Sequence, residues 1–203
     1  MAITNAYRTR SDALPLRSFK AKGRPSAIAG VGAYAPEKII TNFDLEKMMD
    51  TSDKWITERT GIHRRHVAEP GTTTLELATK AARGALDAAG ITANDLDMIL
   101  VGTSSPDGPF PSIAARMQDE LDAPGAVAWD LLAACTSFMY GLSVADSFIA
   151  TERADNVLVI GAEVLSRMLD YSNRGTAVIF GDGARGVQLV LDAAGDRRKR
   201  PVR

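Results

Sequence analysis

The chain has 203 residues, of which 45% are apolar and 24% are charged, and its formal net charge is −1. These proportions exclude a disordered chain, and the balanced charge gives no reason to expect nucleic acid or an anionic membrane as a partner. The single cysteine excludes an internal disulfide. No apolar run reaches the roughly 20 residues needed to cross a bilayer, so we expect a soluble protein of the cytoplasm.

The two ends of the chain differ in composition from its middle. Residues 1–25 carry six basic side chains against the single acid Asp12 and show no apolar periodicity. We expect a disordered basic extension there, with a transit peptide as the alternative. Residues 193–203 form a basic tail, which we interpret as solvated rather than as a nucleic-acid contact. A third interpretation is that this run is not native coding sequence.

Between the ends, residues 26–192 alternate short apolar runs with helical patterns. The runs predict strands at 27–33, 63–68, 96–102, 127–131, 156–162, 177–180 and 187–191. The helical patterns predict helices at 42–49, 74–89, 112–121 and 136–150, and Gly90 is the kind of residue that ends a helix. Apolar strands separated by helices indicate one α/β domain whose sheet is covered on both faces.

Cys135 is the residue with the clearest chemical potential. A lone cysteine usually behaves as a small buried hydrophobe. Here, however, the strand at 127–131 leads through Leu132 to Phe138 directly into a helix. The free N–H groups and the dipole at a helix start favour negative charge, and such a field lowers the pKa of a thiol from about 8.5. These residues alone leave the inert and the nucleophilic interpretation equally open.

Several segments in a fixed order add to this pattern. They are residues 51–56 with 59–62, 110–112, 133–135, 173–176 and 180–184. Together they resemble β-ketoacyl-acyl-carrier-protein synthase III, a condensing enzyme of the thiolase superfamily, from about residue 26 to residue 184. The resemblance implies an α/β, thiolase-like fold, of which this chain would be the N-terminal βαβαβ half with a mixed sheet flanked by helices.

The resemblance also implies an acyltransferase of fatty-acid or polyketide biosynthesis. Cys135 would attack an acyl-CoA thioester, its own N–H would donate to the oxyanion, and malonyl-acyl carrier protein would then condense with the acyl group. The partners implied are acyl-CoA, malonyl-acyl carrier protein and a second copy of the chain in a homodimer. No metal or redox cofactor is required, since coenzyme A enters as part of the substrate.

Other matched positions are implied to bind substrate. Trp55 and Arg174 correspond to a pair that sandwiches the adenine of CoA, for which an aromatic face and a planar guanidinium are suited. Their alternative roles are a core aromatic and a surface charge. Thr51 and Arg59 would lie near the same nucleotide.

Three further apolar residues are matched to the acyl pocket. Phe110 corresponds to a residue that reaches across a dimer interface, and the alternative is a loop aromatic packed on its own core. Phe180 and Leu165 would line the acyl pocket or simply pack there. The two histidines, His63 and His66, have no catalytic counterpart in the family, and the arginines beside them at 64 and 65 indicate an exposed edge.

Some family motifs do not occur in these 203 residues. The His-Gln-Ala-Asn and later Gly-Asn motifs that stabilise the enolate during condensation are missing. We therefore expect no condensation by this chain alone. We also expect exposed apolar helix surface that causes poor solubility or association. The alternative function is a non-catalytic fragment or interaction subunit that pairs with a separate C-terminal half.

Two further hypotheses concern the family and the end of the chain. Half of a hydroxymethylglutaryl-CoA synthase or of a plant-type polyketide synthase would use the same fold and cysteine, but the motifs at 51–62 and 180–184 favour synthase III. After Ala184 the family continues with small residues, whereas Arg185 and Gln188 interrupt this chain. An early stop or a frame shift after about residue 185 would produce that pattern.

Overall fold

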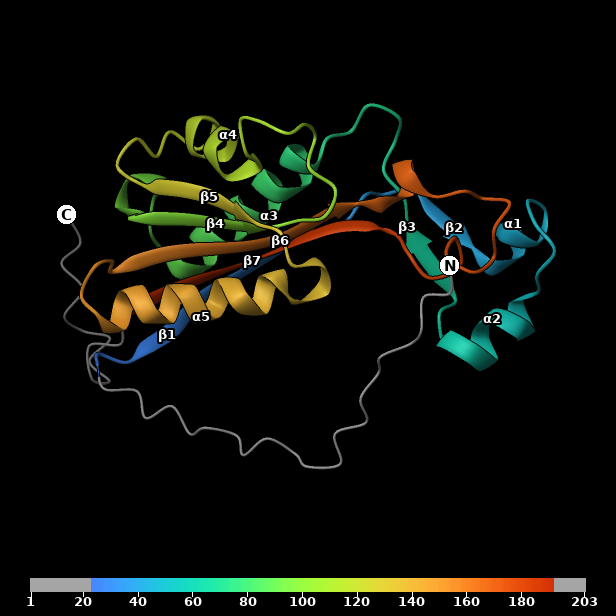
Figure 1. Ribbon diagram of the computed structural model, residues 1–203, viewed down its shortest axis with the longest axis horizontal. Helices are drawn as coiled ribbons and strands as arrows, with labels where there is room; N and C mark the ends of the chain where they lie inside the picture. Colours follow the sequence, from blue (N-terminus) through green and yellow to red (C-terminus); the bar gives the residue numbers. More distant parts are fainter. Residues whose placement is uncertain (1–22, 192–203) are drawn as a thin grey trace, which may run out of the picture.

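The computed structural model describes residues 23–191. They form a large five-stranded sheet with helices on both faces and a smaller lobe beyond one end of it (Figure 1). The predictions for residues 1–22 and 192–203 lie outside the described residues. Within the described part, no helix is long and apolar enough to span a membrane.

The large sheet has the strand order β1-β7-β6-β4-β5. Strands β4, β5 and β6 run parallel, whereas β7 is antiparallel to both of its neighbours, β1 and β6. The sheet is therefore mixed, as the family resemblance implied. The strand bounds are β1 Ser26–Tyr34, β4 Met98–Gly102, β5 Val127–Leu131, β6 Asn156–Val164 and β7 Asp182–Leu191.

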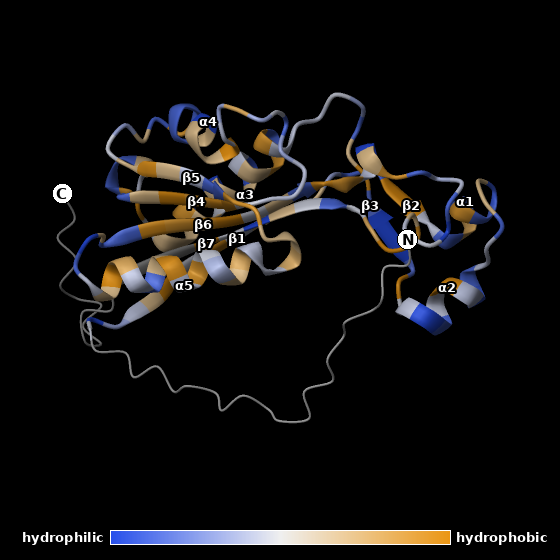
Figure 2. Cartoon of the chain, in the orientation of Figure 1, coloured by the Kyte–Doolittle hydropathy of each residue, from blue (hydrophilic) through white to orange (hydrophobic). Residues whose placement is uncertain are grey.

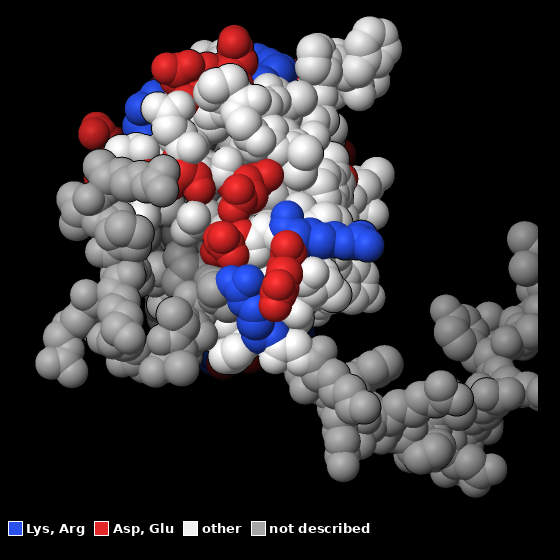
Figure 3. Space-filling model, turned by 90° about the vertical axis from the view of Figure 1, so that its left-hand side faces the viewer, with Lys and Arg blue, Asp and Glu red and all other residues white. Residues whose placement is uncertain are grey.

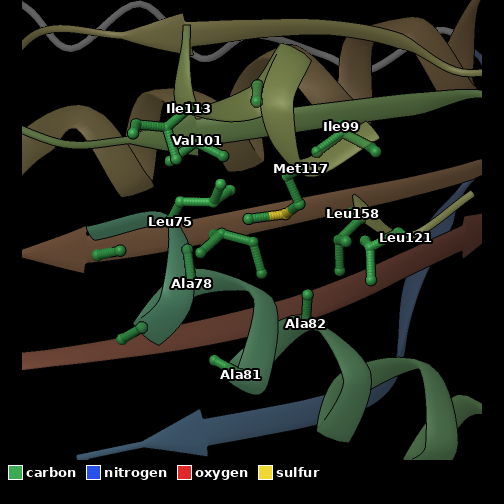
Figure 4. Close-up of a cluster of buried hydrophobic side chains, with 14 of the residues drawn as sticks. Leu75, Ala78, Ala81, Ala82, Ile99, Val101, Ile113, Met117, Leu121 and Leu158 are labelled. Atoms are coloured by element: carbon green, nitrogen blue, oxygen red, sulfur yellow. The ribbon is translucent and has the colours of Figure 1, made fainter. Parts of the chain in front are cut away.

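Helices α3 (Thr74–Ala89) and α4 (Ile113–Glu120) cover one face of the sheet, and α5 (Ser137–Ala150) covers the other. Alternate residues of β4 point to opposite faces. Ile99 and Val101 face α3 and α4, in the cluster drawn in Figure 4, while Met98 and Leu100 face α5. Strand β4 is apolar along its length (Figure 2) because both of its faces are buried.

The small lobe is inserted between β1 and α3. A two-stranded sheet of β2 (Ile39–Thr41) and β3 (Arg64–His66) carries α1 (Asn42–Glu46) and α2 (Asp53–Thr60). The lobe has its own apolar cluster, which includes Leu45, Ile56 and, from the distant connection between β6 and β7, Val178. That connection therefore forms part of the lobe although it lies more than a hundred residues further along the chain.

Most of the predicted elements are confirmed, with three differences. Residues 177–180, predicted as a strand, form turns. Helix α2 and strand β2 were not predicted. Arg185 and Gln188, which interrupt the run of small residues, both lie within β7. Arg185 pairs with Ala33 of β1 and Gly161 of β6, and Gln188 pairs with Gly30 and Leu158. The last predicted strand, 187–191, is the second half of the longer β7.

The end of the large sheet farthest from the small lobe carries acidic and basic side chains side by side (Figure 3). Arg24 there forms ion pairs with Asp155, at 3.0 Å, and with Glu152, at 3.9 Å. This end is formed by the N-terminal ends of the three parallel strands. The opposite end, where β5 runs toward α5, therefore offers the place for a site.

Candidate active site

Cys135 lies where the sequence predicted, between the C-terminal end of β5 and the start of α5. It is the central residue of a short 3-10 turn, η2 (Ala134–Thr136), and it is exposed. The interpretation of Cys135 as an inert buried hydrophobe is therefore wrong. An exposed thiol at a helix start has both the access and the favourable dipole that a nucleophile needs.

The turn that carries the thiol is held in an unusual conformation. Ala134 has a φ of 48°, a left-handed conformation that costs a non-glycine residue on the order of 1 kcal/mol or more. Hydrogen bonds maintain it: the Ala133 N–H donates to Ser137 Oγ at 2.7 Å, and Thr136 Oγ1 donates to the Ala133 carbonyl at 2.7 Å. The Cys135 backbone is thus fixed by its immediate neighbours.

Close packing of α5 on the sheet depends on two glycines. A Cβ on Gly102, the last residue of β4, would lie 2.7 Å from Ser137 Cβ, and one on Gly141 would lie 2.8 Å from Val159 Cγ1. Any side chain at these positions would push the helix away. Gly102 therefore fixes how near the first turn of α5 lies to the end of β4, and Gly141 fixes how near the middle of α5 lies to β6.

The predicted nucleotide residues come together in the small lobe. The guanidinium carbons of Arg59 and Arg174 lie over the Trp55 ring, 4.5 Å and 4.8 Å from its centroid. Arg174 also donates to the Asp50 carbonyl at 3.0 Å. Because Arg174 rests directly on Trp55, an aromatic base would enter between them only after Arg174 had moved away.

Thr51 lies just before α2, beside this group. Its hydroxyl is buried and makes no hydrogen bond within the part of the chain that the structure describes, whereas the neighbouring Ser52 caps α2 by accepting from the Trp55 N–H at 3.1 Å. An unpaired buried hydroxyl is unfavourable by roughly 1–3 kcal/mol. A polar ligand group beside Thr51 would remove that deficit.

Phe110 protrudes from the loop before α4 with 83% of its surface exposed. The alternative that it packs on its own core is therefore wrong. The helix that follows the loop, α4, is anchored by Asp130 of β5, whose carboxylate accepts from the N–H groups of its first two residues, Ile113 and Ala114, at 2.9 Å and 2.7 Å. Asp130, which the sequence did not single out, thus links the start of α4 to the strand that leads to Cys135.

Leu165 and Phe180 lie at the two ends of the connection between β6 and β7. Leu165 begins the short turn η3 (Leu165–Met168) and is half-buried, and Phe180 is 36% exposed. A cavity of about 560 Å³ opens at the Leu165 end of this connection, between the large sheet and the small lobe. Its lining includes Val164 and Ser166, but neither Leu165, Phe180 nor Cys135.

The segment that contains His63 and His66 was predicted to be an exposed edge, and Arg65 departs from that prediction. His63 and Arg64 are exposed, as expected, but Arg65 is only 5% exposed. His66 is held by a 2.6 Å hydrogen bond between Nδ1 and the Pro36 carbonyl. The expectation of an exposed edge is thus wrong for Arg65, whose guanidinium is buried within the small lobe and donates to Asn42 and to the Val178 carbonyl.

Comparison with known proteins agrees with this arrangement. Residues 129–200 match the family model described as 3-oxoacyl-[acyl-carrier-protein (ACP)] synthase III. A β-ketoacyl-[acyl-carrier-protein] synthase III of Thioalkalivibrio sulfidiphilus is 53% identical over 162 residues, which are 80% of this chain and 50% of that protein. This chain resembles the N-terminal half of a β-ketoacyl-acyl-carrier-protein synthase III.

Solved synthase III structures have the same fold. The crystal structure of the enzyme from Aquifex aeolicus superposes with a TM-score of 0.79 at 48% identity, covering 81% of this chain and 53% of that one. The priming β-ketosynthase of the R1128 polyketide pathway superposes with a TM-score of 0.81 at 32% identity, covering 84% and 51%. The thiolase-like fold is therefore established for the described residues.

The comparisons also bear on the extent of the resemblance. The chain spans about half the length of the curated relatives it matches, 50% and 48% for two of them. The family model extends to residue 200. The expectation that the resemblance ends near residue 185 is therefore wrong. Strand β7 also continues past this point, pairing with β1 as far as Leu191 with one register shift between Ile28 and Gly30.

Proposed function

We propose that this chain carries the acyl-accepting part of a β-ketoacyl-acyl-carrier-protein synthase III, in fatty-acid or polyketide biosynthesis in the cytoplasm. The exposed Cys135 at the start of α5 is the observation that carries the proposal. Its thiolate attacks the carbonyl carbon of an acyl-CoA. The bond between that carbon and the CoA sulfur then breaks, and CoA leaves as a thiolate that takes up a proton.

The cluster around Trp55 supports coenzyme A as the acyl donor. Trp55 with Arg174 offers an aromatic and a guanidinium face for adenine, Arg59 offers positive charge for phosphate, and the Thr51 hydroxyl is unpaired. Leu165 and Phe180 flank the β6–β7 connection, where we place the wall of the acyl pocket. Phe110 is exposed enough to reach a second copy in a homodimer.

The second half-reaction, condensation with malonyl-acyl carrier protein, needs a histidine and an asparagine that stabilise the enolate. His63 is exposed on the small lobe, and His66, the last residue of β3, is hydrogen-bonded to the Pro36 carbonyl. Neither lies on the elements that carry Cys135. We therefore propose that these 203 residues accept an acyl group but do not condense it.

Intact-mass measurement tests this proposal directly. Purified chain incubated with acetyl-CoA should gain one acetyl group, and the Cys135→Ala variant should gain none. Adding malonyl-acyl carrier protein should give no β-ketoacyl product. A folded wild-type chain that stays unmodified, or a Cys135→Ala variant that is still modified, would contradict the proposed nucleophile.

A second candidate function is that of an interaction subunit which needs a separate C-terminal half. Three large apolar side chains beside Cys135 favour it: Leu132, Met139 and Tyr140 are 79%, 59% and 55% exposed. Co-expression with the C-terminal half of a synthase III should then restore condensation. The Cys135→Ala variant of the same pair should remain inactive.

A further inference from the structure

Among residues 23–191, Arg65 of β3 is a buried cation without an anionic partner. Its guanidinium donates only to oxygens of uncharged groups: the carbonyl of Ile40 at 3.3 Å, Asn42 Oδ1 at 3.0 Å and the carbonyl of Val178 at 2.8 Å. Its Nε makes no hydrogen bond. Burial lowers the pKa of Arg65, although the neighbouring Tyr171 raises it. Burial of an unpaired charge is unfavourable. The pairing of β2 with β3 does not require a buried arginine at this position, so Arg65 calls for another explanation.

The partners of Arg65 belong to segments that are far apart in the sequence. Val178 lies four residues after Arg174, in the connection between β6 and β7. Asn42, which is fully buried, begins α1 and in turn donates to Asp53 at the start of α2, at 2.9 Å, and to the Ile62 carbonyl just after it, at 2.7 Å. One guanidinium therefore joins the segment that carries Arg174 to the helix that carries Trp55.

The contact between this connection and β3 is close. A Cβ on Gly181 would lie 2.9 Å from the His66 carbonyl oxygen and 3.1 Å from Arg65 Cβ. Ala177 and Val178 are buried against Leu45 and Ile56 in the apolar cluster of the small lobe. Apolar contact allows sliding, whereas hydrogen bonds from a planar, rigid donor fix the relative position of three oxygens.

We propose that Arg65 is a positioning residue that holds the two backbone segments of the nucleotide site, the one that carries Trp55 and the one that carries Arg174, at a fixed separation, while the Arg174 side chain itself turns away to admit the base. The proposal rests on the proposed function, since it requires that these two residues bind the adenine of coenzyme A. Arg65 itself does not touch the nucleotide. A lysine at position 65 keeps the positive charge but lacks the fork that spans Asn42 and Val178.

The test compares the full chain with Arg65→Lys and with Leu77→Ala, a matched control. Leu77 is 1% exposed in the core of the large sheet, so its truncation destabilises the fold without touching the small lobe. Coenzyme A binding is measured by titration calorimetry below the melting temperature of each protein. Acylation of Cys135 is measured with acetyl-CoA and with S-acetyl-N-acetylcysteamine, a thioester without a nucleotide.

Arg65→Lys should bind coenzyme A at least about tenfold more weakly and load more slowly from acetyl-CoA, with unchanged loading from the short thioester. Leu77→Ala should bind and load as the wild type does. The positioning role alone is overturned if Arg65→Lys binds coenzyme A as tightly as the wild type does. It is also overturned if the rate of Cys135 acylation falls equally with acetyl-CoA and with the short thioester. A wild-type chain that binds no coenzyme A overturns the proposed function and this role together.

Discussion

Replacement of Gly102 by alanine tests whether the position of the Cys135 turn depends on the absence of a side chain at the end of β4. The new Cβ would lie 2.7 Å from Ser137 Cβ and 3.0 Å from the Phe138 nitrogen. Carbon atoms in ordinary contact are about 3.5–4.0 Å apart, so the first turn of α5 must retreat by about 0.8 Å or more. The atoms that the new Cβ meets belong to the helix backbone or are attached directly to it, so no flexible side chain can move aside instead.

This displacement should affect both stability and chemistry. Overpacking of this kind destabilises a fold by about 1–3 kcal/mol, which lowers the Tm of a chain of this size by about 2–12 °C. A shift of about 1 Å at a reacting group slows a reaction by up to about 100-fold. We therefore expect Gly102→Ala to load acetyl from acetyl-CoA about 10- to 100-fold more slowly.

The assay is the time course of acetylation by intact mass, together with a thermal melt. Gly84→Ala is the matched control, because its Cβ would meet only Gly32 Cα, at an ordinary 3.5 Å. In the middle of α3 the added methyl should stabilise the chain by about 0.5–1 kcal/mol. If Gly102→Ala melts and loads like the wild type, the reasoning about the close approach of α5 is wrong.

Arg174→Ala should weaken coenzyme A binding by calorimetry about 2- to 30-fold, since it loses a cation–π face, whereas Lys54→Ala on the exposed side of α2 should not. At Asp107 burial raises the pKa, but the Thr74 and Leu75 N–H groups and Arg167 lower it more. Because the pKa of Asp107 is lowered on folding, its ionised carboxylate stabilises the folded state above about pH 4, and this stabilisation is lost as the pH falls below that. Asp107→Asn should lower the Tm at pH 7, and its difference from the wild type should shrink at lower pH; a constant difference would contradict this. Met139→Glu should raise the monomer fraction in sedimentation, because it places charge on exposed apolar surface of α5.

The sequence was most informative where both faces of an element are buried. Strand β4 is apolar at every position because α3 and α5 cover it from opposite sides, so its pattern alone predicted it. The small lobe was harder to predict. Helix α2 buries only Ile56 completely, which leaves almost no apolar periodicity. Its caps, Ser52 and Gly61, were the available signals.

The error at residues 177–180 has a related cause. Ala177 and Val178 are as buried as strand residues, but they fill the small cluster of the lobe from a turn, and the Val178 carbonyl bonds to Arg65 instead of a neighbouring strand. Burial of Arg65 could not be inferred from a basic tripeptide, since its oxygens come from distant segments. The Cys135 turn was predicted because strand, small residues and helix are contiguous there.

The position of β7 between β1 and β6 has a consequence for the order of folding. Its two neighbours in the sheet are β1, at the start of the described chain, and β6, so Ser26 pairs with Leu191. During synthesis β1 must wait for about 150 further residues before it finds a hydrogen-bonding partner, and such distant pairing is slow. Until then β1 and β6 both present open edges to other chains. A ribosome-bound intermediate that ends before β7 should therefore depend on a chaperone, and any variant that delays the docking of β7 should lose yield before it loses stability.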